Sequence, residues 1–78
     1  MNHPELTDQE HDLLVRIANG QSNKAIGRAY AVTGTCAGRY VRRLCERLGA
    51  RDRAHLVGLA FAAELLTEAD VTPAVSAA

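Results

Sequence analysis

Helix start and stop signals recur at short intervals along this chain of 78 residues and limit what it can fold into. The first is Thr7, whose side chain can accept a hydrogen bond from the backbone of Glu10 while the Glu10 carboxylate returns one. Further caps and stops follow at intervals that suit only short helices. They are Gly20, Ser22, Thr33, Gly34, Gly49 and Asp52. This punctuation predicts four helices, the third spanning about residues 35–48.

Apolar residues at helical spacing follow each start signal and supply the candidate core. Aromatic residues make up only 4% of the chain, so leucine, isoleucine, valine and alanine must build this core, which favours packed helices over a β-sandwich. We therefore predict an all-α, four-helix domain over residues 6–66, after an N-terminal arm of residues 1–5. Residues 67–78 are mostly small and include Pro73, so they are expected to form a flexible, disordered tail.

Composition and motifs argue against several classes of protein. No apolar run approaches the roughly 18 residues of a membrane span, and acids stand where a signal peptide would be basic, which predicts a cytoplasmic protein. Cys36 and Cys45 fall on opposite faces of one predicted helix, and no histidine shares ligand spacing with them. No disulfide, metal or cofactor is therefore expected. Without a glycine-rich phosphate loop or a nucleophile–base pair, an enzyme is not expected either.

The net charge is zero, yet the charge is unevenly distributed along the chain. Residues 1–22 carry four acids against one arginine, a net charge of −3, and residues 54–78 carry three acids and no base, again −3. Residues 23–53 carry eight lysines and arginines against two acids, a net charge of +6. Because charges are screened beyond about 8–10 Å at physiological salt, this basic block acts locally. It suits either a polyanion such as DNA or a solvated face balanced by nearby acids.

The predicted third helix has an apolar face and a basic face when its residues are placed at about 100° intervals. The apolar face contains Ala37, Val41, Leu44, Cys45 and Leu48. The opposite face contains Arg39, Arg42, Arg43, Glu46 and Arg47. Arginine carries a planar fork that matches guanine or a phosphate. The pattern favours a helix that packs on the core by one face and offers the other to DNA.

Three motifs stand out along the chain, and the distance between the second and the third makes these two a specific pair. They are Leu-Thr-Asp-Gln-Glu at residues 6–10, Gly-Gln-Ser-Asn-Lys-Ala-Ile at residues 20–26, and Leu-Gly-Ala-Arg-Asp-Arg-Ala at residues 48–54. With them, residues 6–66 resemble the LuxR/GerE-type helix-turn-helix domain, the output domain of FixJ/NarL response regulators and quorum-sensing receptors. The resemblance implies that the second and third helices form the helix-turn-helix, that the third enters the major groove, and that the fourth pairs two copies.

The resemblance also implies roles for residues of the third helix. Arg39 and Arg42 stand where family members commonly contact bases, and Arg43 is adjacent, so these three are the predicted base contacts. Gly38 and Tyr40 replace the Lys and His that usually begin the recognition helix. Gly38 could let this helix lie close to DNA or to a neighbouring helix. Tyr40 could pack on a sugar or a thymine methyl, or fill the edge of the core.

A second set of residues is predicted to contact the DNA backbone. Lys24 matches the lysine of the family's Ser-Asn-Lys motif, and the starts of the second and third helices offer backbone N–H groups. The predicted backbone contacts are Ser22, Asn23, Lys24, Thr35, Cys36, Tyr40, Arg47 and Arg51.

The fourth helix carries an apolar stripe, which is the predicted homodimer interface. It consists of Leu56, Val57, Ala60 and Phe61. The sequence favours a sequence-specific DNA-binding transcriptional regulator that acts on double-stranded DNA as a homodimer. The alternative is a protein-interaction module on the same fold that binds RNA polymerase or another regulator without reading DNA. Loss of the usual Lys and His favours the alternative, whereas the arginines favour the DNA reader.

Overall fold

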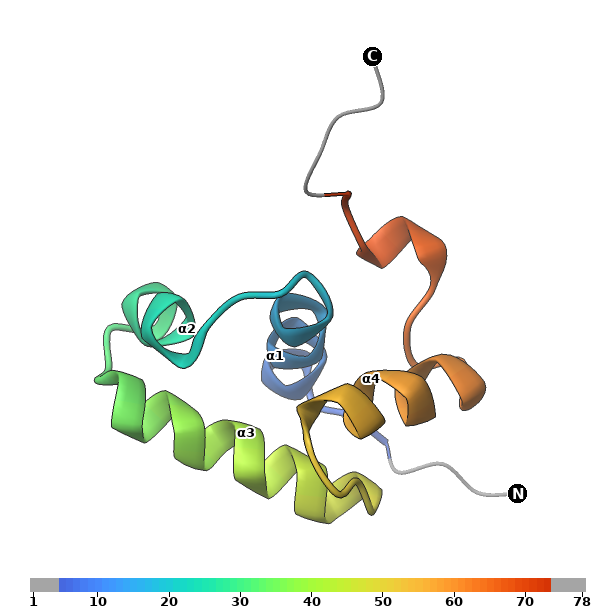
Figure 1. Ribbon diagram of the computed structural model, residues 1–78, viewed down its shortest axis with the longest axis horizontal. Helices are drawn as coiled ribbons and strands as arrows, with labels where there is room; N and C mark the ends of the chain where they lie inside the picture. Colours follow the sequence, from blue (N-terminus) through green and yellow to red (C-terminus); the bar gives the residue numbers. More distant parts are fainter. Residues whose placement is uncertain (1–4, 74–78) are drawn as a thin grey trace.

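The computed structural model describes residues 5–73, and every regular element in that range is helical (Figure 1). The elements are α1 (Asp8–Ala18), α2 (Asn23–Tyr30), α3 (Gly34–Leu48), α4 (Arg53–Ala62) and the short 3-10 helix η1 (Glu68–Asp70). The predicted all-α, four-helix fold is therefore confirmed. None of the helices in this range is long and apolar enough to cross a bilayer.

Each of the four α-helices begins at a side-chain cap. In α1 the Glu10 N–H donates to Thr7 Oγ1 at 3.1 Å, and the Thr7 N–H donates to Glu10 Oε1 at 2.9 Å. The other helices are capped by Ser22, Thr33 and Asp52. Because Thr33 accepts from the backbone N–H of Cys36, α3 begins at Gly34, one residue earlier than the sequence suggested.

The turn between α2 and α3 packs directly on Gly27. Helix α2 ends at Ala31, which has the left-handed φ of 57°, and the Val32 N–H donates to the Gly27 carbonyl at 2.8 Å. A Cβ atom on Gly27 would lie 2.7 Å from the carbonyl oxygen of Val32, closer than real Cβ atoms come. A glycine here therefore allows α2 to turn tightly into α3.

All four helices contribute to one core, and α3 supplies its longest stretch. Figure 1 shows α3 along one side of the molecule, with α2 over its first turns and α4 beside its last. The buried apolar residues are Leu13, Leu14, Ile17, Ile26, Ala37, Val41, Leu44, Cys45, Leu56, Ala60 and Leu66. The face of α3 predicted to be apolar is therefore the face that packs inward, and its exposed face is free for a ligand.

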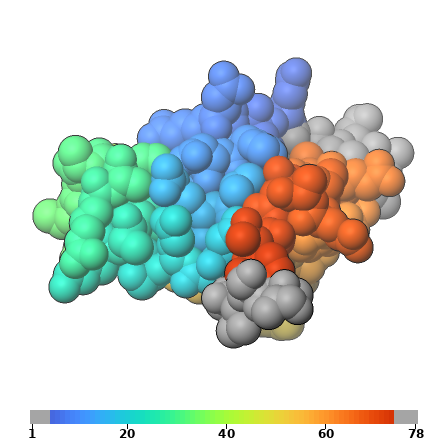
Figure 2. Space-filling model, turned by 90° about the horizontal axis from the view of Figure 1, so that it is seen from above, coloured from blue at the N-terminus to red at the C-terminus, as the bar shows by residue number. Residues whose placement is uncertain are grey.

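The segment after α4 folds back beside the end of α1 instead of forming a disordered tail (Figure 2). The Asn19 Nδ2 donates to the Asp70 carbonyl at 2.8 Å, and the Thr72 N–H donates to Asn19 Oδ1 at 2.7 Å. Leu66 is only 2% exposed and anchors the start of this segment. Because these contacts offset the entropy of ordering, the prediction of a disordered tail is corrected for residues 67–73. The rest of that tail, and residues 1–4 of the expected arm, lie outside the described residues.

Candidate nucleic-acid interface

Arg39 and Arg42 lie together on the solvent-facing side of α3. Both are exposed, and with Thr35 and Gly38 they line an open hollow of about 300 Å³. Within residues 5–73 neither guanidinium takes part in a hydrogen bond or an ion pair. Residues three apart on a helix are surface neighbours. The structure therefore presents two arginine forks side by side, with their donors available to planar acceptors.

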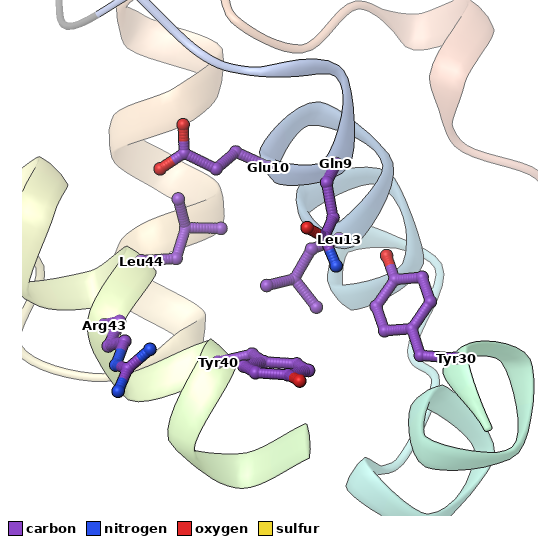
Figure 3. A pocket seen from close by; sticks show the side chains of 7 residues that line it. All are labelled: Gln9, Glu10, Leu13, Tyr30, Tyr40, Arg43 and Leu44. Atoms are coloured by element: carbon purple, nitrogen blue, oxygen red, sulfur yellow. The ribbon is translucent and has the colours of Figure 1, made fainter. Parts of the chain in front are cut away.

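Arg43 borders a separate pocket at the side of α3 that faces α1 (Figure 3). The pocket has a volume of about 220 Å³ and is open to solvent. It is lined by Gln9, Glu10, Leu13, Tyr30, Tyr40, Arg43 and Leu44. Of the three predicted base contacts, the structure thus brings Arg39 and Arg42 into one hollow and leaves Arg43 at the flank.

Arg47 is bound to the start of α1, although its side chain remains 42% exposed. Its Nε lies 2.7 Å from Glu10 Oε2, and its guanidinium also donates to the carbonyl of Glu5. Its charge and one donor are thus engaged within the domain. Its contact with the DNA backbone stays a prediction. Placing the residues of one helix at 100° intervals could not reveal this ion pair, because Glu10 belongs to another helix.

Tyr40 packs at the edge of the core, which supports the second of its two expected roles. Its ring centroid lies 6.4 Å from that of Tyr30, with the rings tilted by 57° (Figure 3). The neighbouring Cys36 side chain, one turn earlier, raises the pKa of Tyr40. The ring thus contacts α2 and is half-buried, and the expected contact of Tyr40 with the DNA backbone stays a prediction.

A three-residue cluster joins α2 to α1. The Tyr30 hydroxyl donates to Asp12 Oδ2 at 2.5 Å, and Arg16 Nε donates to the same oxygen at 2.8 Å. Burial, followed by the Asp12 hydrogen bond, raises the pKa of Tyr30 to about 12. The hydrogen bonds from Tyr30 and then Arg16 lower the pKa of Asp12. Sequence reasoning missed this cluster, although the i,i+4 spacing of Asp12 and Arg16 was a signal for half of it.

The starts of α2 and α3 hold most of the remaining predicted backbone contacts. Lys24 and Thr35 are exposed, and Cys36 is half-buried. The Ser22 hydroxyl accepts from the backbone N–H of Ala25 at 3.1 Å as the cap of α2. Of these four residues, Lys24 carries a formal positive charge and the other three are neutral.

Arg53, to which the sequence analysis gave no role, ties the start of α4 to the start of α2. Its Nη2 donates to the Gln21 carbonyl at 2.6 Å, and its Nη1 donates to Asn23 Oδ1 at 3.2 Å. The family-like motif at residues 48–54 contained Arg53, but periodicity could not reveal a partner 30 positions earlier. Nearby Arg51 has its Nε 4.0 Å from Asp52 Oδ2, and its side chain is 80% exposed. This exposure suits the predicted phosphate contact, which stays a prediction.

Gly38 lies where the start of α2 approaches α3 closely. A Cβ atom on Gly38 would lie 3.1 Å from Nδ2 of Asn23, a distance tighter than nine in ten real Cβ contacts. The missing side chain therefore makes room for the first residue of α2. This favours the neighbouring-helix explanation that the sequence had left beside close approach to DNA.

The two cysteines are not placed for a joint site. Cys45 is buried, and its burial raises the pKa of its thiol, whereas Cys36 is half-buried. Among residues 5–73, no group of three or more histidine, cysteine, aspartate or glutamate side chains could hold a metal ion.

The predicted dimer stripe of α4 is divided between core and surface. Leu56 is 0% and Ala60 1% exposed, so these two belong to the domain's own core and are corrected as dimer contacts. Val57 is half-buried, and Phe61 is 38% exposed. Leu56 and Ala60 are four residues apart, so they lie on the same face of α4, which packs inward. Val57 and Phe61 have the same spacing and lie on the adjacent face, toward solvent.

Comparison with known proteins agrees with this geometry. The family model described as bacterial regulatory proteins of the luxR family, GerE, matches residues 4–60, which includes α1, α2, α3 and most of α4. The searches of curated proteins and of solved structures gave no match. Because the family model covers well over half of the 78 residues, the chain belongs to the luxR family of bacterial regulatory proteins.

Proposed function

We propose that this domain is a sequence-specific DNA-binding transcriptional regulator that inserts α3 into the major groove of double-stranded DNA. The observation that carries the proposal is the pair Arg39 and Arg42, exposed in one hollow of α3 and without partners among residues 5–73. The opposite face of α3 is buried in the core. An amphipathic helix in this arrangement is the reading element of helix-turn-helix proteins.

Arg39 and Arg42 are the proposed base contacts. The guanidinium fork matches the O6 and N7 acceptors of guanine, so two neighbouring forks suit a half-site that contains guanines. Arg43 lies at the flank of this surface and is proposed to reach the outer edge of the half-site.

The DNA backbone is proposed to lie across the starts of α2 and α3. Lys24 and Arg51 supply positive charge, and Ser22, Asn23, Thr35 and Cys36 supply polar groups around it. These contacts set the register of the domain on DNA but carry no sequence information. Since the bacterial chromosome is the proposed target, the protein would act in the cytoplasm.

A homodimer through α4 completes the proposal. Val57 and the exposed ring of Phe61 form its contact surface. Because this apolar surface is small, two copies would associate weakly without DNA and firmly on a target with two half-sites.

Selection from a pool of random duplex DNA tests the proposed function. At moderate salt the full chain should enrich one sequence, and the enriched duplex should bind more weakly as the salt concentration rises. If it enriches no sequence, the DNA-reader assignment is wrong. Capture of RNA polymerase or another regulator in that case would identify the domain as a protein-interaction module.

A further inference from the structure

We infer that Arg53 is a positioning residue for DNA binding, which orients the side-chain amide of Asn23 so that its Nδ2 donates to a DNA phosphate. The inference rests on the proposed function and adds Arg53 to it, as a residue that acts on DNA binding through Asn23. It assigns Arg53 no direct contact with DNA.

Arg53 determines which way the Asn23 amide faces. A guanidinium carries only donors, so the amide oxygen of Asn23 must turn toward it, as the 3.2 Å distance from Nη1 to Oδ1 shows. The second arm of the fork donates to the Gln21 carbonyl at 2.6 Å and fixes the guanidinium in place. With Oδ1 engaged in this way, the donor end of the amide points away from Arg53.

The donor end of Asn23 lies at the rim of the arginine hollow. Nδ2 is 3.1 Å from the position that a Cβ atom on Gly38 would occupy, and Gly38 lines the hollow together with Thr35, Arg39 and Arg42. No hydrogen bond from Nδ2 to another residue is found within residues 5–73. Two N–H bonds are thus directed beside the surface where α3 would meet DNA.

The geometry favours a phosphate over a base as the acceptor. Asn23 is the first residue of α2, beside Lys24, and the first residues of a helix that crosses the DNA backbone meet phosphates. Because the amide oxygen is turned toward Arg53, the amide presents its donors on the other side, and phosphate oxygens are acceptors only. The Ser22 hydroxyl oxygen is engaged as the helix cap, and Asn23 supplies the side-chain amide donor beside it.

A double-mutant cycle with Asn23→Ala and Arg53→Lys tests the inference. Lysine keeps the charge of Arg53 but cannot reach both acceptors with one fork. Each single variant should weaken binding of the selected duplex about tenfold, and the double variant should be no weaker than the weaker single variant. All measurements are made well below the unfolding temperature of each variant. Arg16→Lys, which alters another guanidinium that joins secondary-structure elements, is the matched control and should bind like the wild type.

Nuclear magnetic resonance gives a readout that a purely structural role would not change. In the wild type the Asn23 side-chain N–H signals should shift when the selected duplex is added, and in Arg53→Lys they should stay near their free positions although the duplex is bound at higher concentration. The inference is wrong if those signals do not move in the wild type. It is also wrong if Arg53→Lys weakens binding equally in the Asn23→Ala background, since Arg53 would then contact DNA directly. Failure of the wild type to bind any duplex would instead overturn the proposed function.

Discussion

The Nε atom of Arg47 lies 2.7 Å from the Oε2 atom of Glu10, while Oε1 of the same carboxylate accepts the N–H of Thr7. One side chain therefore completes the cap of α1 and binds the last turn of α3. The contact removes one arginine from the basic face of α3. Among residues 5–73, the arginines of that face whose guanidinium makes no ion pair are Arg39 and Arg42, with Arg43 beside them.

Substitutions of Glu10 should separate its two roles. Glu10→Gln keeps an oxygen for the Thr7 N–H and loses the ion pair, whereas Glu10→Ala loses both. We expect Glu10→Ala to lower the free energy of unfolding by about 1–2 kcal/mol and Glu10→Gln by less than half of that, because the ion pair is partly exposed. Urea unfolding measures both, with Gln9→Ala as the control. Equal losses for the two variants would show that the hydrogen bond from the Thr7 N–H to this side chain contributes nothing.

The cluster of Tyr30 and Asp12 should make stability depend on alkaline pH. The pKa of Tyr30 is raised to about 12, so its contribution is complete below pH 10, the usual pKa of tyrosine, and is lost as the pH rises toward 12. Tyr30→Phe removes the hydrogen bond and should cost about 1 kcal/mol at neutral pH. The difference in unfolding free energy between wild type and Tyr30→Phe should then shrink between pH 10 and pH 12. A difference that stays constant across this range would contradict the assignment.

The lowered pKa of Asp12 should make the stability of the fold depend on acidic pH as well. A carboxyl with a lowered pKa stabilises the fold above its ordinary pKa of 3.8, and this contribution is lost as the pH falls below that value. Since the hydrogen bond from Tyr30 is the largest cause of the shift, Tyr30→Phe should move the pKa of Asp12 upward. Titration of the Asp12 carboxyl carbon by nuclear magnetic resonance checks this, and an unchanged midpoint would refute it.

Asn19→Ala should release the segment that follows α4. The amide makes two hydrogen bonds to that segment, to Asp70 and Thr72, and alanine can make neither. We expect amide protons of residues 68–72 to exchange faster and their backbone order parameters to fall, while α1 to α3 remain unchanged. Leu66 should keep its protection because it packs in the core. An unaltered segment would mean that apolar packing alone holds it.

Phe61→Ser should abolish self-association without unfolding the domain, because this side chain is the exposed large hydrophobic residue of α4. In sedimentation, the average mass of the wild type should rise with concentration, and that of Phe61→Ser should stay at the monomer value. Ala62→Ser, at the exposed next position, is the matched control. A wild type that is monomeric throughout and also binds DNA as a single copy would rule out the proposed dimer.

The features that sequence analysis predicted correctly are local, and those it missed depend on distant pairs. The caps at Thr7 and Asp52 and the buried face of α3 follow from residues within a few turns of one another. The engagement of Arg47 by Glu10 and the folding back of residues 67–73 join segments that are far apart in the chain. Periodicity places a side chain on a face of its own helix, but it does not say which neighbour that face will meet.

The candidate site was predictable to the same extent. Arg39 and Arg42 could be assigned because helical spacing alone puts them opposite the apolar residues of α3. Arg53 could not, because its role depends on the approach of α4 to the start of α2. The meaning of Gly38 likewise became clear only once Asn23 was found beside it.

The most direct measurement of the central claim is selection from random duplex DNA with wild type, Arg39→Ala and Arg42→Ala. Each bidentate base contact is worth about 1–3 kcal/mol of discrimination. We therefore predict that the wild type enriches one sequence and that each variant loses preference at a different base position in each half-site. Circular dichroism should stay the same, because both side chains are exposed. Arg28→Ala, which removes the same charge from α2, should leave the base preference intact. If both variants keep the full preference of the wild type, α3 does not read DNA through these arginines, and the central claim is wrong.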